Sequence, residues 1–320
     1  MPPMKSNNLS RMDQRNITEA SHNDPIETIV PLIKTRLKHN SIPENTTLDQ
    51  LETIVDELAA FGFGRQLLKH RAISGLWTQY MVLYPDLFAT SGLDPHGKPQ
   101  TDFERWILTH SPTILATQER FKIFQKITQD FLQDGMTLAS IPCGLMDDLF
   151  RLDFTKAPNA NLIGIDIDPE AINFARQAAD KFLLSDKTQF IQSSAWNTPL
   201  ANTCDLITSN GLTIYEANEE NILELYQHFL KVLKPGGMLI TSFLTPPPML
   251  NKESPWDMNA VDPEALPIQR LVFVDILNAQ WQHYRMEKDV RAQLEHAGFE
   301  KISFTYDQAK LFPTVCAFKP

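Results

Sequence analysis

The stretch Leu138-Ala-Ser-Ile-Pro-Cys-Gly144-Leu-Met-Asp-Asp-Leu149 decides the fold. It reads as a buried strand, a tight turn with one glycine and the start of a helix, which is where a doubly wound sheet places its ligand. Asp166 follows Gly144 by 22 residues, at the end of the next apolar run. That spacing matches the acid that accepts hydrogen bonds from ribose hydroxyls in nucleoside-binding α/β folds. Together the two residues predict a ligand that contains adenosine.

The same turn is poorly suited to a dinucleotide. A pyrophosphate is bound by several glycines, as in G-x-G-x-x-G, because backbone N–H groups must approach it closely, and this turn has only Gly144. Asp147 and Asp148 lie where the helix N-terminus would receive the phosphates, and their charge opposes binding. A nicotinamide-dependent oxidoreductase is therefore the weaker alternative. The best match is S-adenosyl-L-methionine, which has no phosphate.

Further segments occur in the order of a known family. After 138–145 they are Gly164-Ile-Asp-Ile-Asp168, Gln192-Ser-Ser-Ala-Trp196, Asp205-Leu-Ile-Thr-Ser-Asn-Gly-Leu212 and Leu233-Lys-Pro-Gly-Gly-Met-Leu-Ile240. With them, residues from about 134 to 320 resemble the class I S-adenosylmethionine-dependent methyltransferases. The resemblance implies an α/β fold with a seven-stranded Rossmann-like methyltransferase sheet, closed by a hairpin after Gly298. It also implies methyltransferase activity with S-adenosyl-L-methionine as cofactor.

The resemblance carries a set of cofactor-binding residues onto this chain. They are Pro142, Cys143, Gly144, Asp166, Ile167, Ser194, Ala195, Trp196, Asn210 and Gly211. Family members with helical N-terminal extensions often contact the cofactor's carboxylate from just before the first strand, and Arg120 is the candidate for that contact. Asp168 is expected to be a helix N-cap, because Pro169 follows it.

The chain departs from the family pattern at two positions. Ser140 stands where the family usually has an acid, so the cofactor's ammonium must be recognised by backbone carbonyls or by another acid, for which Asp147 is the candidate. Ser194 stands where an acid usually binds the adenine amine. We therefore expect the adenine to be held more by stacking, with Trp196 nearby, than by a charged hydrogen bond.

The chain divides by its patterning into a tail and two larger parts. Residues 1–24 are polar and predict a disordered tail, and residues 25–133 show helical spacing, broken by loops at 41–45 and 91–99. After Gly135, apolar runs alternate with amphipathic helices, which is typical of a parallel sheet covered on both faces. We predict a helical N-terminal lid or substrate domain over 25–133 and an S-adenosylmethionine-binding methyltransferase domain over 134–320.

Individual elements of the second part follow from its periodicity. Strands are predicted at 137–141, 161–167, 188–191, 205–209, 238–243, 302–306 and 314–318, and helices from Pro169, from about Asn218, and over 287–296 with Gly298 as C-cap. Lys234-Pro-Gly-Gly237 is expected to end the second helix and turn the chain into the next strand. The segment before the last helix contains Pro246–Pro248, Trp256 and Pro263, and is long enough to cover an acceptor pocket or to be a passive loop.

Composition limits the partners. Hydrophobic residues make up 42% and charged residues 21% of the chain, which predicts a folded, soluble protein. The net charge of −10, without a basic patch, repels nucleic acid and anionic membranes. The fourth strand ends in Ser209-Asn-Gly-Leu and lacks the Asn/Asp-Pro-Pro-aromatic motif of base-amine methyltransferases. We expect a small-molecule acceptor, with protein methylation left open and a non-catalytic cofactor-binding module as the alternative.

The chemistry needs alignment more than a dedicated catalyst. Methyl transfer is an in-line displacement, so a base is optional unless the acceptor is an alcohol, for which His283 and Tyr284 are candidates. Arg285 is expected to anchor structure. No metal is expected, because the eight histidines show no ligand spacing and the fourth strand offers no further carboxylate beside Asp166 and Asp168.

The compartment follows from the cysteines. The three cysteines, Cys143, Cys204 and Cys316, are far apart and odd in number, which favours a reducing compartment over a disulfide framework. The N-terminus has no apolar core of a secretory signal, and no run approaches the length of a membrane span. A cytoplasmic location is expected.

Overall fold

The computed structural model describes residues 25–73, 75–279 and 282–320. The disordered tail predicted over residues 1–24 lies outside the described residues. Of the helices described, none combines the length and the apolar character that crossing a membrane requires.

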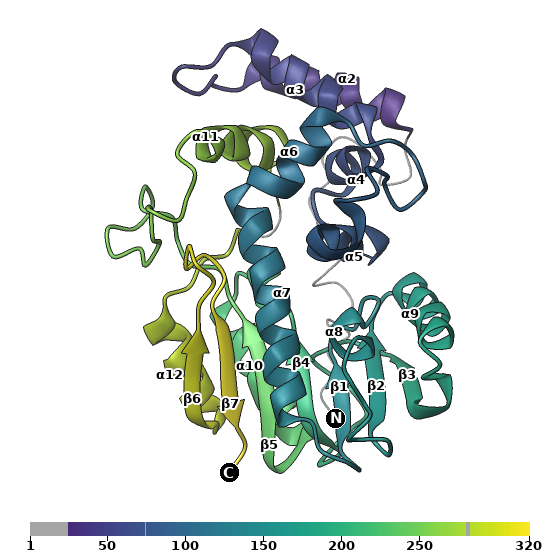
Figure 1. The fold of residues 1–320 in the computed structure, drawn as a ribbon. Helices are drawn as coiled ribbons and strands as arrows, with labels where there is room; N and C mark the ends of the chain where they lie inside the picture. The colour runs from purple at the N-terminus through teal and green to yellow at the C-terminus, as the bar shows by residue number, and fades with distance from the viewer. Residues whose placement is uncertain (1–24, 74, 280–281) are drawn as a thin grey trace, which may run out of the picture.

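A single mixed sheet forms the centre of the second part of the chain (Figure 1). Its strands are β1 (Thr137–Ser140), β2 (Asn161–Asp166), β3 (Thr188–Gln192), β4 (Cys204–Ser209), β5 (Leu233–Ser242), β6 (Glu300–Thr305) and β7 (Thr314–Phe318). They lie in the order β3-β2-β1-β4-β5-β7-β6, with β1 to β5 parallel and β7 antiparallel to both β5 and β6. The predicted seven-stranded sheet with its closing hairpin is confirmed.

The strand order places the exit of β1 at the middle of the sheet. β1 lies between β2 and β4, and Ser140 pairs in register with Gly164 of β2 and with Thr208 of β4. The chain leaves β1 toward β2 on one side and reaches β4 on the other, which makes this a topological switch point. The loops that follow β1, β2 and β4 therefore open side by side at the carboxyl edge.

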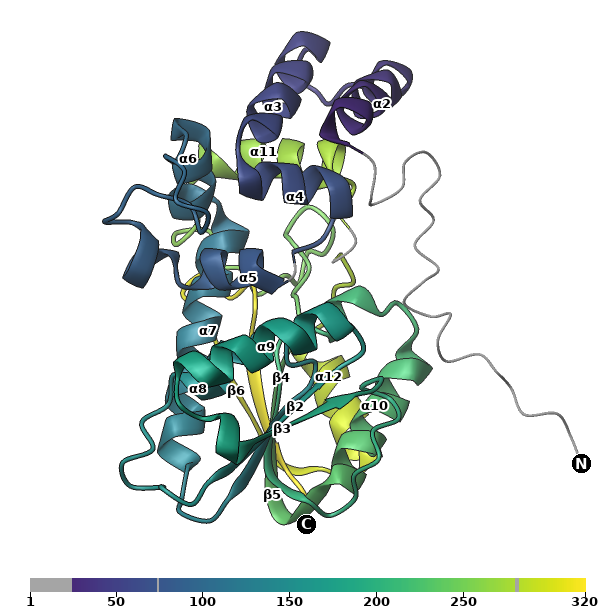
Figure 2. The same ribbon diagram turned by 90° about the vertical axis from the view of Figure 1, so that its right-hand side faces the viewer.

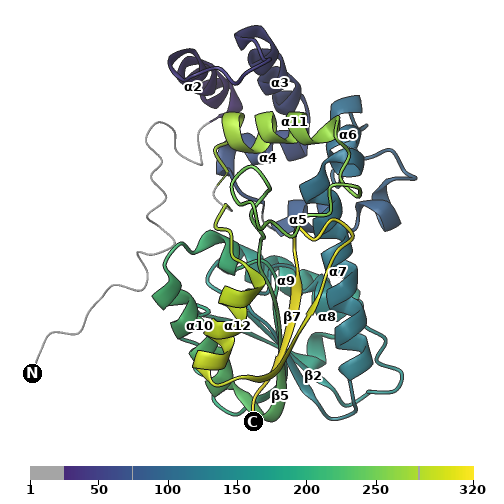
Figure 3. The ribbon, with the colours of Figure 1, turned by 90° about the vertical axis from the view of Figure 1, so that its left-hand side faces the viewer.

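Helices cover both faces of the sheet (Figure 3). One face carries α7 (Pro112–Phe131), α8 (Asp147–Phe150) and α9 (Pro169–Lys181), and the other carries α10 (Glu219–Val232) and α12 (Glu287–Ala297). Their ends follow the predicted capping. Asp168 accepts from Glu170 N, Asn218 accepts from Glu220 N, and Gly298 has φ +102°.

A layer of helices lies above the carboxyl edge (Figure 2). It contains α2 (Ile26–His39), α3 (Leu48–Ala60), α4 (Gly62–His70), α5 (Gly75–Val82) and α6 (Asp102–His110), with a π-helical turn at Tyr84–Phe88 and the predicted loops between them. α7 runs from this layer down along the sheet and so joins the two parts (Figure 1). The side chain of Gln79 on α5 donates to Asp147 Oδ2 at 2.7 Å, which ties the layer to the loop after β1.

The segment after β5 belongs to the helical layer. It forms α11 (Ala265–Arg270) and a π-helical stretch at Leu271–Ile276. Its buried side chains Val272, Phe273 and Ile276 share one hydrophobic cluster with α2 to α7 and with residues 311–312 of the β6–β7 loop. The helical layer is thus packed from three separate parts of the chain.

One predicted boundary was wrong. The prediction placed a turn at 234–237 and began the fifth strand at Met238, whereas β5 begins at Leu233, directly after α10. Leu233 pairs with Cys204, and the register then shifts before Leu206 pairs with Met238. Gly236 has φ +77°, so the glycines that looked like a turn form an irregularity within the strand.

Candidate functional site

The loop after β1 is held on both sides by its neighbouring strands. Ile141 N donates to Thr208 O of β4, and Cys143 N donates to Ile165 O of β2, both at 2.8 Å. These bonds extend the ladder beyond Ser140 and fix Pro142 between them. Gly144 follows with φ +47°, and no atom lies within 4 Å of the position a Cβ would take there. The conformation favours glycine, and the space in front of it is open.

Asp166 joins the ends of two strands. Its Oδ2 accepts from Gly144 N and its Oδ1 accepts from Asp168 N, both at 3.0 Å. Burial raises the pKa of this carboxyl, and the two backbone hydrogen bonds oppose that rise. A carboxylate oxygen accepts more than one hydrogen bond, so each oxygen keeps capacity for a ligand hydroxyl. The structure therefore brings together the two residues that the spacing singled out, Gly144 and Asp166.

The loop after β3 lies beside the end of β2. Ser193 N donates to Asp166 O at 2.9 Å, and Trp196 N donates to Ser194 Oγ at 3.3 Å. The Trp196 indole N–H donates to Asn221 O of α10 at 2.8 Å, so the ring is held in place, and with Ala195 it belongs to the core between the sheet and α10. Ile167 follows β2 directly and is half-buried.

The exit of β4 carries Asn210 and Gly211. Gly211 has φ +75°, and its N–H donates to Ser242 Oγ at 3.1 Å. Ser209 Oγ and Asn210 Oδ1 are buried without a hydrogen-bond partner in the described parts of the chain. Buried polar atoms are nearly always paired with protein, water or ligand. The two unpaired atoms therefore mark the exit of β4 as a candidate binding position.

Arg120 reaches the same exit from α7. It is 6% exposed, its guanidinium carbon lies 4.5 Å from the centre of the Phe312 ring, and its Nη2 lies 3.4 Å from the position a Cβ on Gly211 would take. The structure thus brings Arg120 to the exit of β4, close to one of the residues predicted to bind the cofactor.

Asp148 is a site residue that the sequence reasoning missed. Ser140 Oγ donates to Asp148 Oδ2 at 3.0 Å, and Thr208 Oγ1 donates to the same oxygen. The carboxylate therefore lies directly beside the serine that occupies the family's acid position. Burial raises its pKa to about 6, with the two hydroxyls opposing the rise. No local signal distinguishes Asp148 from Asp147, because the contact depends on how α8 folds back on β1 and β4.

Asp147 is held by other side chains. Besides Gln79, it accepts from Arg151 Nε at 2.8 Å, one helical turn further along the chain. Burial raises its pKa, and the Arg151 charge opposes the rise. Its predicted role with the cofactor's ammonium stays a prediction. Asp147, Asp148 and Asp166 nevertheless surround the β1 loop with carboxyl groups, which suits a ligand bearing positive charge and opposes a pyrophosphate.

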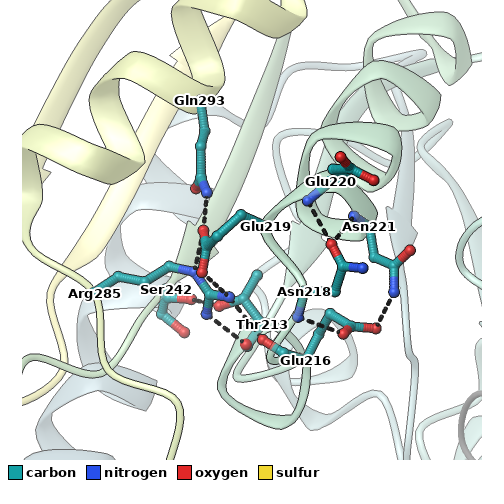
Figure 4. Close-up of polar contacts among 9 residues, drawn as sticks. All are labelled: Thr213, Glu216, Asn218, Glu219, Glu220, Asn221, Ser242, Arg285 and Gln293. Atoms are coloured by element: carbon teal, nitrogen blue, oxygen red, sulfur yellow. Dashed lines mark hydrogen bonds and ion pairs between the residues drawn. The ribbon is translucent and has the colours of Figure 1, made fainter.

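Arg285 organises the segment between β4 and α10 (Figure 4). Its guanidinium donates to Thr213 O at 2.9 Å and Glu216 O at 2.6 Å, and pairs with the Glu219 carboxylate at 2.9 Å. Its own N–H donates to Leu244 O at 2.8 Å. The expected anchoring role is confirmed, and the loop it holds is the one that begins with Asn210 and Gly211.

The two candidate bases lie next to Arg285. His283 N donates to Ile214 O at 3.3 Å, and Tyr284 forms a bridge with Leu244. Burial lowers the pKa of His283, with the Arg285 charge acting in the same direction, and burial raises the pKa of Tyr284. Both residues therefore stay near the β4 exit in their neutral forms at pH 7.

The residues at the exits of β1 and β2 fit S-adenosylmethionine by their chemistry. A carboxylate that holds the turn glycine provides acceptors for a ribose diol, the space before Gly144 is open, and the surrounding acids match the positive charge of a sulfonium and an ammonium. Within the described residues, no group of three or more His, Cys, Asp or Glu side chains is placed to hold a metal ion.

Comparison with known proteins agrees with this geometry. The sequence model of a family described as methyltransferase domain matches residues 132–304. The solved structure of a possible exported protein from Bordetella parapertussis has 37% sequence identity and a TM-score of 0.86, over 94% of this chain and 97% of that one. The helical layer and the sheet described here therefore both have a counterpart in a solved structure.

Two curated relatives are more distant. Sterol 24-C-methyltransferase of Pneumocystis carinii is 31% identical over 173 residues, which are 53% of this chain and 41% of that protein. Erythromycin 3''-O-methyltransferase of Saccharopolyspora erythraea is 29% identical over 117 residues, covering 36% of this chain and 37% of that protein. The chain spans about two fifths of the length of these two relatives.

Proposed function

Because the chain belongs to the methyltransferase-domain family, as a class I enzyme that uses S-adenosylmethionine, we propose that it methylates a small-molecule acceptor. The net charge of −10 supports a small molecule over nucleic acid, which an acidic protein repels. The helical layer above the carboxyl edge supports the same choice, because it covers the β1 exit through the contact between Gln79 and Asp147.

The hydrogen bond between Gly144 N and Asp166 Oδ2 carries the placement of the cofactor. It fixes the carboxylate at the turn where the ligand of such a sheet binds, and we assign Asp166 to the ribose hydroxyls. The segment Ser194–Trp196 would border the adenine beyond β3, and Pro142, Cys143 and Gly144 would line the methionine end. Asp148, beside Ser140, takes the place of the missing family acid in setting the negative potential there.

In this arrangement the protein acts by positioning. The bound cofactor supplies a methyl group on a sulfonium, which transfers to an aligned nucleophile without a metal or a covalent intermediate. Asn210 and Gly211, which the resemblance assigns to the cofactor, would border its methyl group at the exit of β4. The acceptor would approach beside them, along the loop that Arg285 holds through Thr213 O. For an acceptor that must lose a proton, His283 is better suited than Tyr284, because burial keeps the imidazole neutral and able to accept one.

We also propose that the protein works in a reducing compartment such as the cytoplasm. Cys143, Cys204 and Cys316 are free and buried, and burial raises the pKa of each thiol. Buried thiols at raised pKa are poor nucleophiles and do not form disulfides with one another here. The possible export of the Bordetella parapertussis protein makes localisation a direct test of this proposal.

Calorimetric titration with S-adenosylhomocysteine, S-adenosylmethionine and NAD tests the function. We expect both adenosyl compounds to bind and NAD not to bind. Asp166→Ala should weaken adenosyl binding by about 10- to 100-fold, the effect of losing hydrogen bonds to a charged group. Asp166→Asn, which preserves the shape of the side chain, separates loss of charge from collapse of the loop.

The matched control is Asp186→Ala, which removes an exposed carboxyl outside the site. It should bind the adenosyl compounds as the unchanged protein does. Binding of NAD in place of S-adenosylhomocysteine, or full affinity in folded Asp166→Ala, would contradict the assignment.

A further inference from the structure

Arg120 is a buried cation that has no anionic partner at hydrogen-bonding distance among the residues the structure describes. Its side chain is 6% exposed, and Nε and Nη1 have no hydrogen-bond partner among the residues that the structure describes. Burial lowers the pKa of Arg120 to about 10, with the Asp307 charge opposing the fall, so the guanidinium stays charged at pH 7.

The neighbouring acid is already engaged. Asp307 Oδ1 accepts from Leu311 N at 3.1 Å and its Oδ2 accepts from Phe312 N at 2.7 Å, so this carboxylate holds the β6–β7 loop. The Phe312 ring lies against one face of the guanidinium and accepts no hydrogen bond from the in-plane N–H groups of Nε and Nη1, which have no partner among the described residues. A buried charge without a hydrogen-bonded partner is costly, and native structures rarely retain one unless a ligand completes it.

The position of Arg120 separates it from the predicted cofactor residues on β1 and β2. The sheet order is β2-β1-β4-β5-β7, and the guanidinium lies between Gly211, just after β4, and Phe312, just before β7. Asp166 and Gly144 lie at the exits of β2 and β1, on the opposite side of β4. The unpaired Nε and Nη1 therefore lie at the exit of β4, away from the β1 and β2 exits and beside Gly211, where the proposed function places the meeting of cofactor and acceptor.

Gly211 allows this approach. A Cβ at that position would lie 3.4 Å from Arg120 Nη2 and 3.6 Å from Nη1. Any larger side chain would contact the guanidinium directly and occupy space beside it. The glycine thus keeps a side chain from standing against the guanidinium at the exit of β4.

We propose that Arg120 binds a carboxylate of the methyl acceptor, so that the substrate is a small organic acid. This proposal rests on the proposed function. One unpaired guanidinium neutralises one negative charge, and a planar carboxylate matches its N–H donors. A phosphate would add charge to a region that already contains Asp307, so the carboxylate is the better match.

Two titrations test the proposal in the full-length protein. First, S-adenosylhomocysteine and its analogue lacking only the carboxylate are titrated into the unchanged protein, Arg120→Met and Lys122→Met. Lys122 is the matched control, because it is an exposed cation on the same helix and pairs only with Asp86 in the described structure. Then acetate and benzoate are titrated into each protein saturated with S-adenosylhomocysteine, with acetamide and benzamide as neutral counterparts.

We expect Arg120→Met to keep its affinity for S-adenosylhomocysteine within twofold and to lose at least tenfold in affinity for acetate or benzoate. Lys122→Met should bind both as the unchanged protein does, and the amides should bind at least tenfold more weakly than the acids. If Arg120→Met does not fold, Arg120→Lys replaces it and should show intermediate affinity for the acids, because the charge remains but the planar donors are lost.

Three results would overturn the proposal. Equal binding of the acids to Arg120→Met and the unchanged protein, or no binding to either, would remove the carboxylate site. A loss of S-adenosylhomocysteine affinity in Arg120→Met that the analogue lacking the carboxylate does not show would assign Arg120 to the cofactor. Failure of the unchanged protein to bind S-adenosylhomocysteine would overturn the proposed function itself, and this is a separate observation.

Discussion

At the scale of single residues, Asp148 shows how a family position is filled from another place in the chain. Ser140 lacks the carboxyl group that the family has there, but its hydroxyl donates to Asp148, which Thr208 also contacts. A carboxyl group therefore still lies beside β1, although the residue at the family's acid position is a serine. Burial raises the pKa of the Asp148 carboxyl to about 6.

That raised pKa predicts a pH dependence of stability. Because the folded-state pKa of Asp148 is about 6 against an ordinary 3.8, the folded protein binds the proton more tightly than the unfolded chain. Its contribution to stability is therefore fully present below about pH 4 and is lost as the pH rises through 6. Relative to Asp148→Asn, the unchanged protein should lose about 2 kcal/mol of unfolding free energy between pH 4 and pH 7.

Urea unfolding of both proteins at pH 4 to 8 measures this difference. Asp186→Asn, which makes the same replacement at an exposed position, is the control. A difference between Asp148→Asn and the unchanged protein that stays constant over this range would show that Asp148 does not titrate as described.

At the scale of elements, the segment between β4 and α10 is the one that shapes the exit of β4. Its end is capped by Asn218, which accepts from Glu220 N at 2.8 Å, and its middle is held by Arg285 through two carbonyls and Glu219 (Figure 4). The Glu219 carboxylate also accepts from Gln293 of α12. Arg285 thus ties the segment after β4 to α10, and Glu219 ties α10 to α12.

Arg285→Met should lower the unfolding free energy by about 2–3 kcal/mol, because Thr213 O and Glu216 O lose a charged donor. We also expect the KM for the acceptor to rise more than the Kd of S-adenosylhomocysteine, since the β4 exit moves while the β1 and β2 exits stay. Denaturant unfolding and titration measure the two effects.

Lys288→Met is the control on α12, where an exposed cation pairs with Glu253 at 3.3 Å. It should change stability by less than about 0.5 kcal/mol. An Arg285 variant as stable as the Lys288 variant would show that the loop holds itself in place.

At the scale of the whole molecule, the helical layer and the sheet are built from interleaved parts of the chain. The cluster that packs α2 to α6 also contains Leu244, the stretch 272–277 and Leu311, all from beyond β4. α7 contributes Phe121 to that cluster and Phe124 to the core beneath it. The layer is therefore fastened to the sheet through α7, through the segment after β5 and through the β6–β7 loop.

A chain that begins at residue 132 should consequently fail to fold into a stable protein. It would expose the apolar side chains of 244, 272–273, 276–277 and 311–312, which now pack against the helices. We expect aggregation, strong binding of a hydrophobic dye, and no cooperative thermal transition. A chain that begins at residue 25 keeps every described element and should melt like the full chain. Cooperative unfolding of the 132–320 chain would show that the sheet does not need the layer.

The same interleaving explains how far the sequence could predict the site. Gly144 and Asp166 could be predicted as a pair, because both follow buried strands at a spacing set by one strand-helix-strand unit. Asp148 beside Ser140 could not, since no spacing tells which of two neighbouring acids turns toward β1. The pairing state of Arg120 could not either, because it depends on residues near 211, 307 and 312.

By itself, the sequence determined most strand positions and the helix caps at Asp168 and Asn218, because periodicity and capping are local properties. The order of its motifs carried the family resemblance, which implied the seven-stranded sheet and S-adenosylmethionine as cofactor. Only the tertiary structure decided that β5 begins at Leu233 and that the segment after β5 joins the helical layer. It also decided that Nε and Nη1 of Arg120 have no hydrogen-bond partner in the described part of the chain. These features arise from contacts between distant parts of the chain, whose free energies no local pattern records.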